Sequence, residues 1–336
     1  MRAVIYQGPD LPLRLSETPG APLAADEVRL SLAACGICGS DLHMAHAPQT
    51  FGIAAGAVLG HEFAGTVSEV GADVTTLEVG QHVAVCPIRG CGACAACRDG
   101  EPAWCPQMRL IGGGYAEETV VAARQCRIVP DDVALPDAAL AEPCAVALHA
   151  VLRARPRPGA HVLILGAGPI GLLVAFWARR MGAAEVVVAD IRPDQAGLAA
   201  TVGATRFEIS DNGLADRLAQ DGVFPQVVYE CVGRPGLIDR AVALVAGRGT
   251  VVGVGLCIGP DSWNGFAALH KEVTLVMSAF FSMAEFEMAL EALRPGQGAG
   301  PQKLITERIT LDAAPDTFAK LQAAASGCKT IIEMSF

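Results

Sequence analysis

The sequence predicts an α/β protein of two domains, one β-rich and one built on a doubly wound parallel sheet. Three observations lead to this prediction. The chain has 336 residues, more than one hydrophobic core usually organises. Up to about residue 145, short alternating segments are separated by Gly/Pro turns. From about residue 160 to 278, continuous apolar runs alternate with helical segments, as in parallel sheets that are buried on both faces.

The β-rich part is predicted from period-two alternation. Residues 28–32 alternate polar and apolar side chains, as a half-buried strand does, and residues 67–71 are similar. Residues 1–6 are also expected to form a strand. Near the other end, residues 284–293 are expected to form a helix and residues 330–334 a strand. We assign these segments to one domain, which comprises residues 1–145 and 280–336.

The second domain, residues 146–279, is predicted from its strand–helix units. Residues 162–165 and 186–189 form apolar runs typical of buried strands, and residues 171–181 between them have the character of an apolar helix. Further strands are expected over residues 227–230 and 250–254.

The composition of the chain indicates which kinds of partner it binds. A formal net charge of −10 argues against nucleic-acid binding. No apolar run reaches the roughly 18 residues that cross a membrane, and the N-terminus lacks a signal-peptide pattern. We therefore expect a cytoplasmic protein that acts on a small molecule and interacts with neither membranes nor nucleic acids.

Four cysteines give the strongest local signal. With spacing C-x2-C-x2-C-x7-C they are Cys91, Cys94, Cys97 and Cys105. Thiolates this close in sequence can fill the four positions of a tetrahedral Zn²⁺ and leave none for substrate. We therefore expect a structural zinc in a lobe of residues 86–108, called here the four-cysteine lobe. Disulfides are the alternative, but the length of the chain and the missing secretory signal favour metal.

A glycine motif indicates a dinucleotide site. The G-x-G-x-x-G run follows a predicted strand and opens a predicted helix; its cofactor-contacting residues are Gly166, Gly168, Pro169, Ile170 and Gly171. Such glycines allow a tight turn, close approach of a pyrophosphate and helix–strand packing. The alternative is a turn without a ligand.

The residue after the next strand bears on which dinucleotide binds. Asp190 lies 19 residues beyond Gly171, where a carboxylate can accept hydrogen bonds from the adenosine ribose and repel a 2′-phosphate. This favours NAD over NADP, although the nearby Arg192 could weaken the preference.

A second metal site is less clear from the local pattern. Cys38 stands in a C-x2-C pair with Cys35, and His61-Glu62 follows a glycine. Taken alone, the pair could be half of another structural zinc site, and a histidine after glycine is usually structural. Spacing cannot decide whether these residues meet.

The order of motifs along the chain resembles that of the zinc-dependent medium-chain dehydrogenases of the alcohol and polyol dehydrogenase type. The resemblance covers essentially the whole length. It depends on residues 36–43, residues 60–65, the four-cysteine lobe, Glu142-Pro143 and residues 166–171. It implies a GroES-like catalytic domain followed by a Rossmann NAD-binding domain, two zinc ions per chain, and a homodimer or homotetramer.

The resemblance also implies a catalytic zinc site. Cys38 and His61 correspond to zinc ligands, and Glu62 to a group that binds zinc directly or through water. Glu142 corresponds to the fourth position, for which Cys144 is a rival. A thiolate, an imidazole and carboxylates suit Zn²⁺ and leave room for a substrate oxygen.

Positioning and catalytic groups follow from the same resemblance. Asp41 should orient the His61 ring, with a turn or helix cap as the alternative. Ser40 should accept the substrate proton and pass it through the cofactor ribose to His43, which exchanges it with solvent. The alternatives are a helix cap for Ser40 and an exposed surface position for His43.

The resemblance also implies which residues line the nicotinamide: Val254, Gly255, Leu256, Ser278 and Ala279. The alternative is that these residues are ordinary strand ends.

Two positions depart from the polyol-dehydrogenase pattern. Met44 stands where those enzymes usually have Tyr, and Phe280 where they often have Arg. The loop of residues 109–115 is also shorter than usual, which implies more room. We therefore expect an apolar secondary alcohol or ketone as substrate, with room for a cyclic or bulky one. For these two residues the alternative is that Met44 and Phe280 only pack against their neighbours. For the protein the alternatives are a polyol, diol or threonine-type dehydrogenase and a non-catalytic zinc- and NAD-binding protein.

Overall fold

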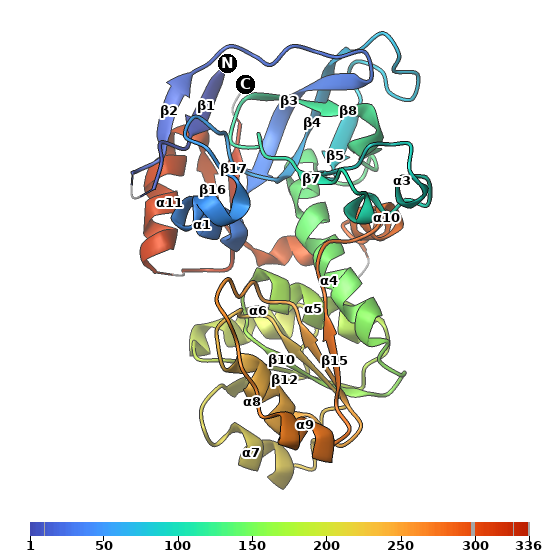
Figure 1. Cartoon of the computed structure of the whole chain (residues 1–336), viewed down its shortest axis with the longest axis vertical. Helices are drawn as coiled ribbons and strands as arrows, with labels where there is room; N and C mark the ends of the chain where they lie inside the picture. Colours follow the sequence, from blue (N-terminus) through green and yellow to red (C-terminus); the bar gives the residue numbers. More distant parts are fainter. Residues whose placement is uncertain (10, 297–299, 325, 335–336) are drawn as a thin grey trace. The chain divides into compact units, whose positions relative to one another are not determined.

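The computed structural model describes residues 1–9, 11–296, 300–324 and 326–334. The chain divides into two compact units, each drawn with its own sheet in Figure 1. Unit 1 comprises Met1–Glu142, Ser282–Gly298 and Ile305–Phe336, and unit 2 comprises Pro143–Phe281 and Ala299–Leu304. Each unit has a hydrophobic cluster of its own.

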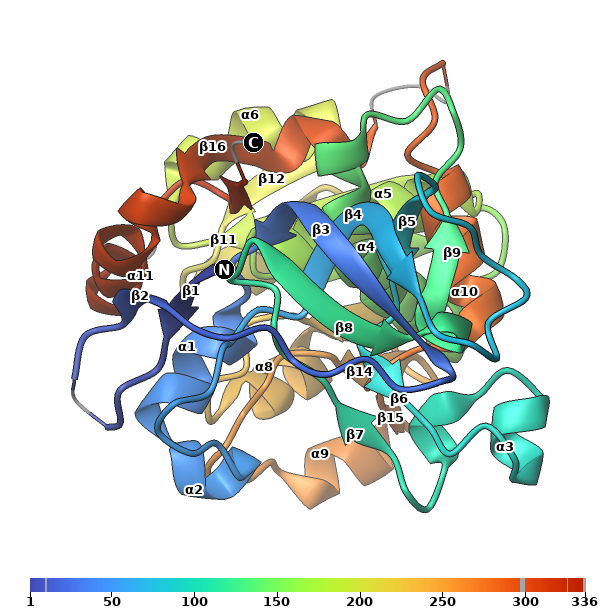
Figure 2. The same cartoon turned by 90° about the horizontal axis from the view of Figure 1, so that it is seen from above.

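Unit 1 is built around a mixed sheet with the strand order β16-β17-β3-β4-β5-β9, and β8 also pairs with β3. In Figure 2, the strands β3, β4 and β8 of this sheet lie side by side. Two-stranded pairs β1-β2 and β6-β7 complete the strands. The strands of unit 1 are β1 (Arg2–Ile5), β2 (Arg14–Glu17), β3 (Glu27–Gly36), β4 (Glu62–Val70), β5 (His82–Val85), β6 (Ile88–Arg89), β7 (Arg109–Leu110), β8 (Glu118–Ala122), β9 (Cys126–Ile128), β16 (Ile305–Thr310) and β17 (Lys329–Glu333).

The helices of unit 1 are short, between four and ten residues long. They are α1 (Gly39–His46), α2 (Pro48–Phe51), α3 (Ala95–Arg98), α10 (Met283–Glu291) and α11 (Ala314–Ala323), with 3₁₀ turns that include η1 (Pro102–Trp104) and η3 (Leu135–Leu140). The turn η3 packs against β3, β4 and β5. The N-terminus of α10 is fixed by Ser282, whose side chain accepts a hydrogen bond from the Glu285 amide, while the Glu285 carboxylate accepts one from the Ser282 amide.

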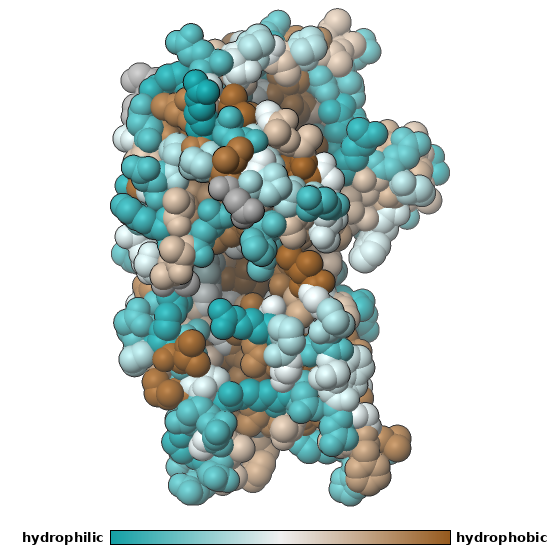
Figure 3. All heavy atoms as spheres, turned by 60° about the vertical axis from the view of Figure 1, so that its left-hand side comes forward, coloured by the Kyte–Doolittle hydropathy of each residue, from teal (hydrophilic) through white to brown (hydrophobic). Residues whose placement is uncertain are grey.

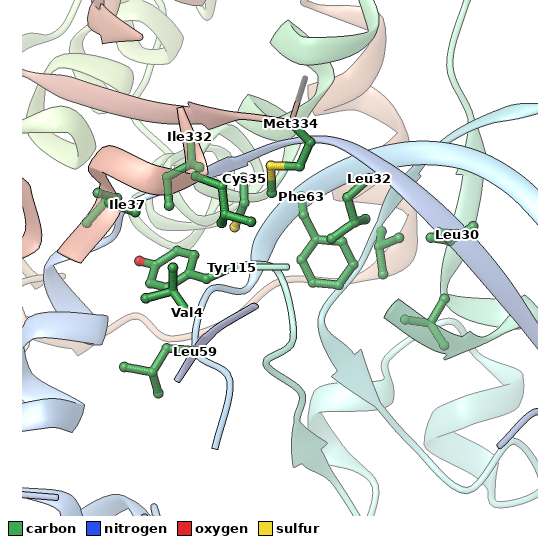
Figure 4. Close-up of a cluster of buried hydrophobic side chains, with 14 of the residues drawn as sticks. Val4, Leu30, Leu32, Cys35, Ile37, Leu59, Phe63, Tyr115, Ile332 and Met334 are labelled. Atoms are coloured by element: carbon green, nitrogen blue, oxygen red, sulfur yellow. The ribbon is translucent and has the colours of Figure 1, made fainter. Parts of the chain in front are cut away.

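The core of unit 1 gathers apolar side chains from both ends of the chain. Figure 4 shows the Tyr115 ring among Val4, Cys35 and Leu59, with Ile332 of the last strand nearby. All five are buried. The ring of Tyr115 also makes an edge-to-face contact with Phe318 of α11, with 6.4 Å between ring centroids. The core therefore joins the first strands to residues more than 200 positions later.

Unit 2 contains a six-stranded parallel sheet with the order β12-β11-β10-β13-β14-β15. This order reverses direction between β10 and β13, as in the doubly wound dinucleotide-binding fold. The strands are β10 (His161–Leu165), β11 (Glu185–Asp190), β12 (Arg206–Ile209), β13 (Val227–Glu230), β14 (Thr250–Gly253) and β15 (Thr274–Met277). The predicted fold class, a β-rich domain plus a doubly wound domain, is confirmed.

Helices cover both faces of the unit 2 sheet. Alternate strand residues point to opposite faces, and both sets are apolar, so each face must be buried. Leu163 and Leu165 pack in one hydrophobic cluster with residues of α7 and α8, whereas Ile164 faces Gly171 of α5. The helices are α5 (Pro169–Arg180), α6 (Ala196–Thr201), α7 (Leu214–Gln220), α8 (Leu237–Leu244) and α9 (Gly265–His270). The helix α5 begins two residues before the predicted start, since Pro169 occupies its first turn.

The helix α4 (Ala141–Ala154) continues directly from η3. An 18-residue window of the combined helical stretch Leu135–Ala154 has a mean hydropathy of 1.3, enough to cross a membrane by length and composition alone. Two thirds of that window is buried inside the protein, as expected of a core helix.

Candidate functional site

Three predicted ligands come together beside α1 in unit 1. One ligand atom from each of Cys38, His61 and Glu62 lies within 4.8 Å of the others, and we call these residues the three-ligand group. Cys38 is the N-cap of α1, and Glu62 is the first residue of β4. His61 and Glu62 are buried, while Cys38 is half-buried. The register that pairs Gly36 with Glu62 brings the end of β3, just before Cys38, beside the start of β4.

Asp41 holds this group in place through its two carboxylate oxygens. Its Oδ1 lies 3.1 Å from His61 Nδ1, and its Oδ2 accepts hydrogen bonds from the Tyr115 hydroxyl at 2.7 Å and the Cys38 amide at 3.0 Å. Asp41 is fully buried. It therefore both caps α1 and orients His61, so the two roles weighed for it in the sequence coexist.

The electrostatics of this pair follow from burial and contact. Burial alone raises the pKa of Asp41, but the charge and hydrogen bond of His61 outweigh it and hold that pKa below its usual value. Burial disfavours the charged His61 ring, yet Asp41 raises the pKa of His61 well above the ordinary value. Zinc binding through the remaining ring nitrogen requires the neutral imidazole and so releases a proton.

The residues of the three-ligand group fit a zinc ion. A thiolate, an imidazole and a carboxylate are the donors that zinc takes in proteins. Glu62 Oε2 forms an ion pair with Lys329, whereas Oε1 is buried and has no hydrogen-bond partner among the described residues. A buried acceptor without a donor is costly unless a cation or water occupies the space beside it.

Glu142 lies outside the three-ligand group, although it belongs to the same unit. It stands at the start of α4 and is 8% exposed. Burial raises its pKa to about 7, and the charges of His61 and Lys329 oppose that rise. Cys144 is fully buried in α4, where burial raises its pKa to about 12.

The predicted proton-transfer residues follow Cys38 on α1. Ser40 Oγ lies 3.1 Å from Cys38 Sγ and 3.3 Å from His61 Nε2. The helix begins at Gly39 with Cys38 as its N-cap, so Ser40 is not a helix cap. His43 is half-buried, and burial together with the nearby His46 lowers its pKa.

The four-cysteine lobe brings its sulfur atoms together. The sulfurs of Cys91, Cys94, Cys97 and Cys105 all lie within 4.8 Å of one another. Backbone amides donate hydrogen bonds to these sulfurs. Cys91 Sγ accepts from the amides of Ala93 and Cys94, both at 3.4 Å. These hydrogen bonds lower the pKa of Cys91 to about 6. All twelve cysteines lie within the described part of the chain, and none of them is joined in a disulfide there.

The glycine motif of unit 2 has the geometry of a phosphate-binding turn. Gly166 has a φ of +102°, and a Cβ on Gly171 would lie 2.0 Å from the Gly166 carbonyl oxygen. Gly168 is the N-cap of α5 and has no atom within 4 Å of its Cβ position, so its backbone is open to a ligand. These features fit a dinucleotide pyrophosphate at the helix N-terminus.

Asp190 ends β11 next to this turn. Its carboxylate accepts hydrogen bonds from the amides of Ala167 at 2.6 Å and Arg192 at 2.8 Å. The guanidinium of Arg192 lies 3.7 Å from the same carboxylate. The charge of Asp190 is therefore fixed beside the glycine turn.

The other expected cofactor positions follow β14 and β15. The amides of Val254 and Gly255 donate to the Glu230 carbonyl, and a Cβ on Gly255 would lie 2.1 Å from the Gly233 amide nitrogen. The backbones therefore meet where the strands end. Leu256 and Ala279 are exposed, and the Ser278 hydroxyl is buried without a partner among the described residues.

The two expected substrate-pocket residues differ in setting. Met44 lies on α1 in unit 1 and is only 7% exposed. Phe280 belongs to unit 2, is half-buried, and has a φ of +61°, which is unusual for a bulky side chain.

Two residues of unit 1 were not assigned a role from the sequence. Tyr115 donates to Asp41, and Lys329 pairs with Glu62. Burial lowers the pKa of Lys329, but the charges of Glu62 and Cys38 outweigh this and raise it. A lysine directly before an apolar strand is the only signal in the sequence, and it does not name a partner.

Comparison with known proteins identifies the family of this chain. Residues 24–131 match the family described as the alcohol dehydrogenase GroES-like domain, and residues 169–294 match the family described as zinc-binding dehydrogenase. The chain therefore belongs to the zinc-dependent medium-chain dehydrogenase family.

Individual relatives cover most of the chain. A 2-dehydro-3-deoxy-L-galactonate 5-dehydrogenase of Pseudoalteromonas atlantica is 31% identical over 92% of each chain. A D-xylulose reductase A of Aspergillus oryzae is 30% identical over 92% of this chain and 89% of that protein.

Solved structures are similar over almost the whole length. Galactitol-1-phosphate dehydrogenase of Escherichia coli superimposes with a TM-score of 0.90 at 28% identity, covering 99% of this chain and 100% of that chain. A short chain alcohol dehydrogenase of E. coli with bound NADH has the same TM-score and identity, over 99% of each chain. A zinc-binding dehydrogenase of Sinorhizobium meliloti with bound NADP gives 0.89 at 29% identity, covering 99% of this chain and 98% of that chain.

Proposed function

We propose that this chain is an NAD-dependent zinc dehydrogenase that interconverts a secondary alcohol and its ketone. The observation that carries the proposal is the three-ligand group, in which Cys38, His61 and Glu62 converge and Asp41 orients the imidazole. Membership of the zinc-dependent dehydrogenase family supports it.

The residues around the three-ligand group have different roles in the proposed reaction: some hold the zinc and others transfer the proton. Zinc held by Cys38, His61 and Glu62, with Glu142 nearby, supplies a Lewis acid that lowers the pKa of a substrate hydroxyl. Ser40, next to two of these ligands, accepts the proton of the alcohol. His43 carries it to solvent.

The lowered pKa of His43 keeps its ring neutral near pH 7, as a proton acceptor requires. When bound, NAD would supply the acceptor for the hydride of the carbinol carbon. In the reverse direction, the same groups return the proton to the developing alcohol.

The second zinc of the proposal belongs to the four-cysteine lobe. Four thiols that converge leave no place for substrate, so this ion has a structural role. The expected content is therefore two zinc ions per chain, one in each site.

NAD is the proposed dinucleotide because of Asp190. Its fixed negative charge disfavours the 2′-phosphate of NADP, while Arg192 beside it limits the preference. Of the similar structures named above, the E. coli enzyme contains NADH and the S. meliloti enzyme NADP, so members of the family bind either cofactor.

Two substrate classes are supported by different observations. The apolar side chains of Met44 and Phe280 favour an apolar secondary alcohol or ketone. The names of the relatives, which include a D-xylulose reductase and a dehydrogenase of a sugar acid, favour a polyhydroxylated substrate.

One experiment separates these classes. Purified zinc-loaded protein is assayed for NADH formation with aliphatic and cyclic secondary alcohols, with sorbitol and xylitol, and with sugar acids, and NADP is tested in parallel. Faster turnover of polyols would assign the chain to the second class. No NADH formation with any alcohol, in protein that binds zinc and NAD, would reject the enzymatic proposal.

We also propose that the chain forms a homodimer or homotetramer through the edge of the unit 2 sheet. Among the described residues, the strand β15 pairs with β14 alone, and Leu275 and Met277 on it are 36% and 63% exposed. Phe266 and Leu269 of α9 are 76% and 74% exposed. Elsewhere, hydrophobic and hydrophilic side chains are mixed on the face drawn in Figure 3.

Exposed apolar residues beside an open strand edge are typical of a surface that another copy covers. Light scattering should therefore give at least twice the monomer mass, and Leu275→Lys should shift the protein toward monomer. The four-cysteine lobe, proposed above as a zinc site, suits a reducing compartment, and we therefore propose that the protein acts in the cytoplasm.

A further inference from the structure

A buried lysine from the last strand reaches into the three-ligand group. Lys329, the first residue of β17, is 2% exposed. Its Nζ forms an ion pair with Glu62 Oε2 and donates a hydrogen bond to the Ile37 carbonyl oxygen at 3.0 Å. A lysine this deeply buried is rare unless its charge is paired.

The absence of a side chain at Gly36 leaves the space in the sheet that this contact needs. The strand β3 lies between β17 and β4, and Gly36 at its end pairs with Ile331 on one side and Glu62 on the other. A Cβ on Gly36 would lie 2.0 Å from Glu62 Oε2 and 2.9 Å from Lys329 Cε. Since Gly36 does not have a left-handed backbone, the glycine is needed here for close approach. The lysine chain crosses the middle strand through the space that this glycine leaves.

The ion pair between Lys329 and Glu62 also affects the net charge of the proposed zinc site. With a neutral imidazole, the thiolate of Cys38 and the carboxylates of Glu62 and Glu142 bring three negative charges to the proposed zinc site. A divalent zinc ion leaves one negative charge in a buried environment, where unpaired charge is costly. Lys329 supplies the balancing positive charge. The count covers the proposed ligands only; Asp41 is not one of them, and its own negative charge is stabilised by hydrogen-bond donors, among them the amide of Cys38.

We infer that Lys329 is a positioning residue of the zinc site: it holds Glu62 Oε2, leaves Oε1 free to bind the metal, and balances the charge of a ligand set with two carboxylates. This inference rests on the proposed zinc site at the three-ligand group. A purely structural ion pair would instead stabilise the sheet and leave metal affinity unchanged.

The test compares zinc affinity in Lys329→Met with that of the parent protein, using a chromogenic zinc chelator as competitor. The four-cysteine lobe provides an internal reference, because its zinc should be retained equally by both proteins. Lys320→Met is the matched control, since Lys320 is an exposed residue of α11 in the same unit. Loss of a residue that positions a ligand typically weakens metal binding by about 10–100-fold. We expect that loss for one zinc in Lys329→Met and none in Lys320→Met.

A second pair of variants separates positioning from folding. Removing one member of a buried ion pair can destabilise the protein strongly, so the melting temperature of the zinc-free form is measured as well. Glu62→Gln and the double variant Glu62→Gln/Lys329→Met complete a double-mutant cycle. If Lys329 acts through Glu62, its replacement should cost much less zinc affinity in the Glu62→Gln background than in the parent.

The outcomes separate this inference from the function on which it rests. A parent protein that binds zinc only in the four-cysteine lobe would reject the proposed zinc site itself. Two zinc ions bound with equal affinity by the parent and Lys329→Met would overturn the inference alone. An equal loss of zinc affinity in both backgrounds of the cycle would also overturn it, because Lys329 would then act without Glu62.

Discussion

The hydroxyl of Tyr115 donates a 2.7 Å hydrogen bond to the carboxylate of Asp41. Both side chains are fully or almost fully buried, and the same carboxylate contacts His61 Nδ1. The orientation of a predicted zinc ligand therefore depends on a residue that never touches the metal.

Replacing Tyr115 by Phe should weaken zinc binding at the three-ligand group. A hydrogen bond to a charged acceptor contributes about 1.5–3 kcal/mol, so the zinc affinity should fall by about tenfold or more. Zinc competition and thermal unfolding measure the effect. Tyr6→Phe is the control, because the buried Tyr6 hydroxyl donates to the neutral Ala45 carbonyl at 3.1 Å. Equal zinc affinities in the two variants would contradict the role of Tyr115.

The Asp190 carboxylate should decide the choice of dinucleotide. Asp190→Asn keeps the size of the side chain but removes the negative charge that repels a 2′-phosphate. We expect the preference for NAD over NADP, measured as the ratio of kcat/KM values, to fall by at least about tenfold. Arg192→Ala should change the ratio in the opposite direction. An unchanged ratio in Asp190→Asn would show that other groups select the cofactor.

The pH dependence of alcohol oxidation should report on His43. The neutral ring accepts the proton, and burial together with His46 lowers its pKa below 6.5. Activity should therefore be retained below pH 6.5 and be lost as the pH falls through the lowered pKa. His46→Gln removes a like charge, so the acid limb of the kcat/KM profile should move to higher pH.

His43→Gln provides the second arm of that test. It should remove the acid limb and lower kcat by about 10²-fold, the usual contribution of a proton-transfer group. An acid limb that is identical in the parent and both histidine variants would assign it to another residue.

The two proposed zinc sites should respond differently to serine substitution. Cys97→Ser breaks a group whose four sulfurs lie within 4.8 Å, so the melting temperature should fall by at least about 5 °C and one zinc should be lost. Cys38→Ser should abolish turnover with little change in the melting temperature. Metal analysis that finds one zinc per fully active chain would contradict this division.

Much of the fold could be predicted because its signals are local. The apolar runs at residues 162–165 and 186–189 become β10 and β11, which pair in parallel in the centre of the unit 2 sheet. The glycine motif follows β10 and opens α5, as its spacing predicts. In each case residues close in sequence determine the structure, so composition and period are sufficient.

The site could be predicted only in part. Cys38, His61 and Glu62 were expected together on the strength of a family resemblance, since spacing alone did not pair them. Lys329 and Tyr115 could not be found, because their partners lie far away in the sequence and neither belongs to a motif with a known spacing. Such contacts depend on strand register, which a single sequence does not specify.

The position of β17 has a consequence for how the protein is made. The hydrogen bond from Lys329 to Ile37 joins residues 292 positions apart, so this side of the unit 1 sheet closes last during synthesis. Residues 143–281 emerge as one uninterrupted segment and can fold on the ribosome before then. A nascent chain carries all the predicted zinc ligands by residue 142, yet it must wait for its final strand before their surroundings are complete. Premature termination shortly before residue 329 should therefore yield a chain with a folded nucleotide-binding unit and an open, aggregation-prone β3 edge.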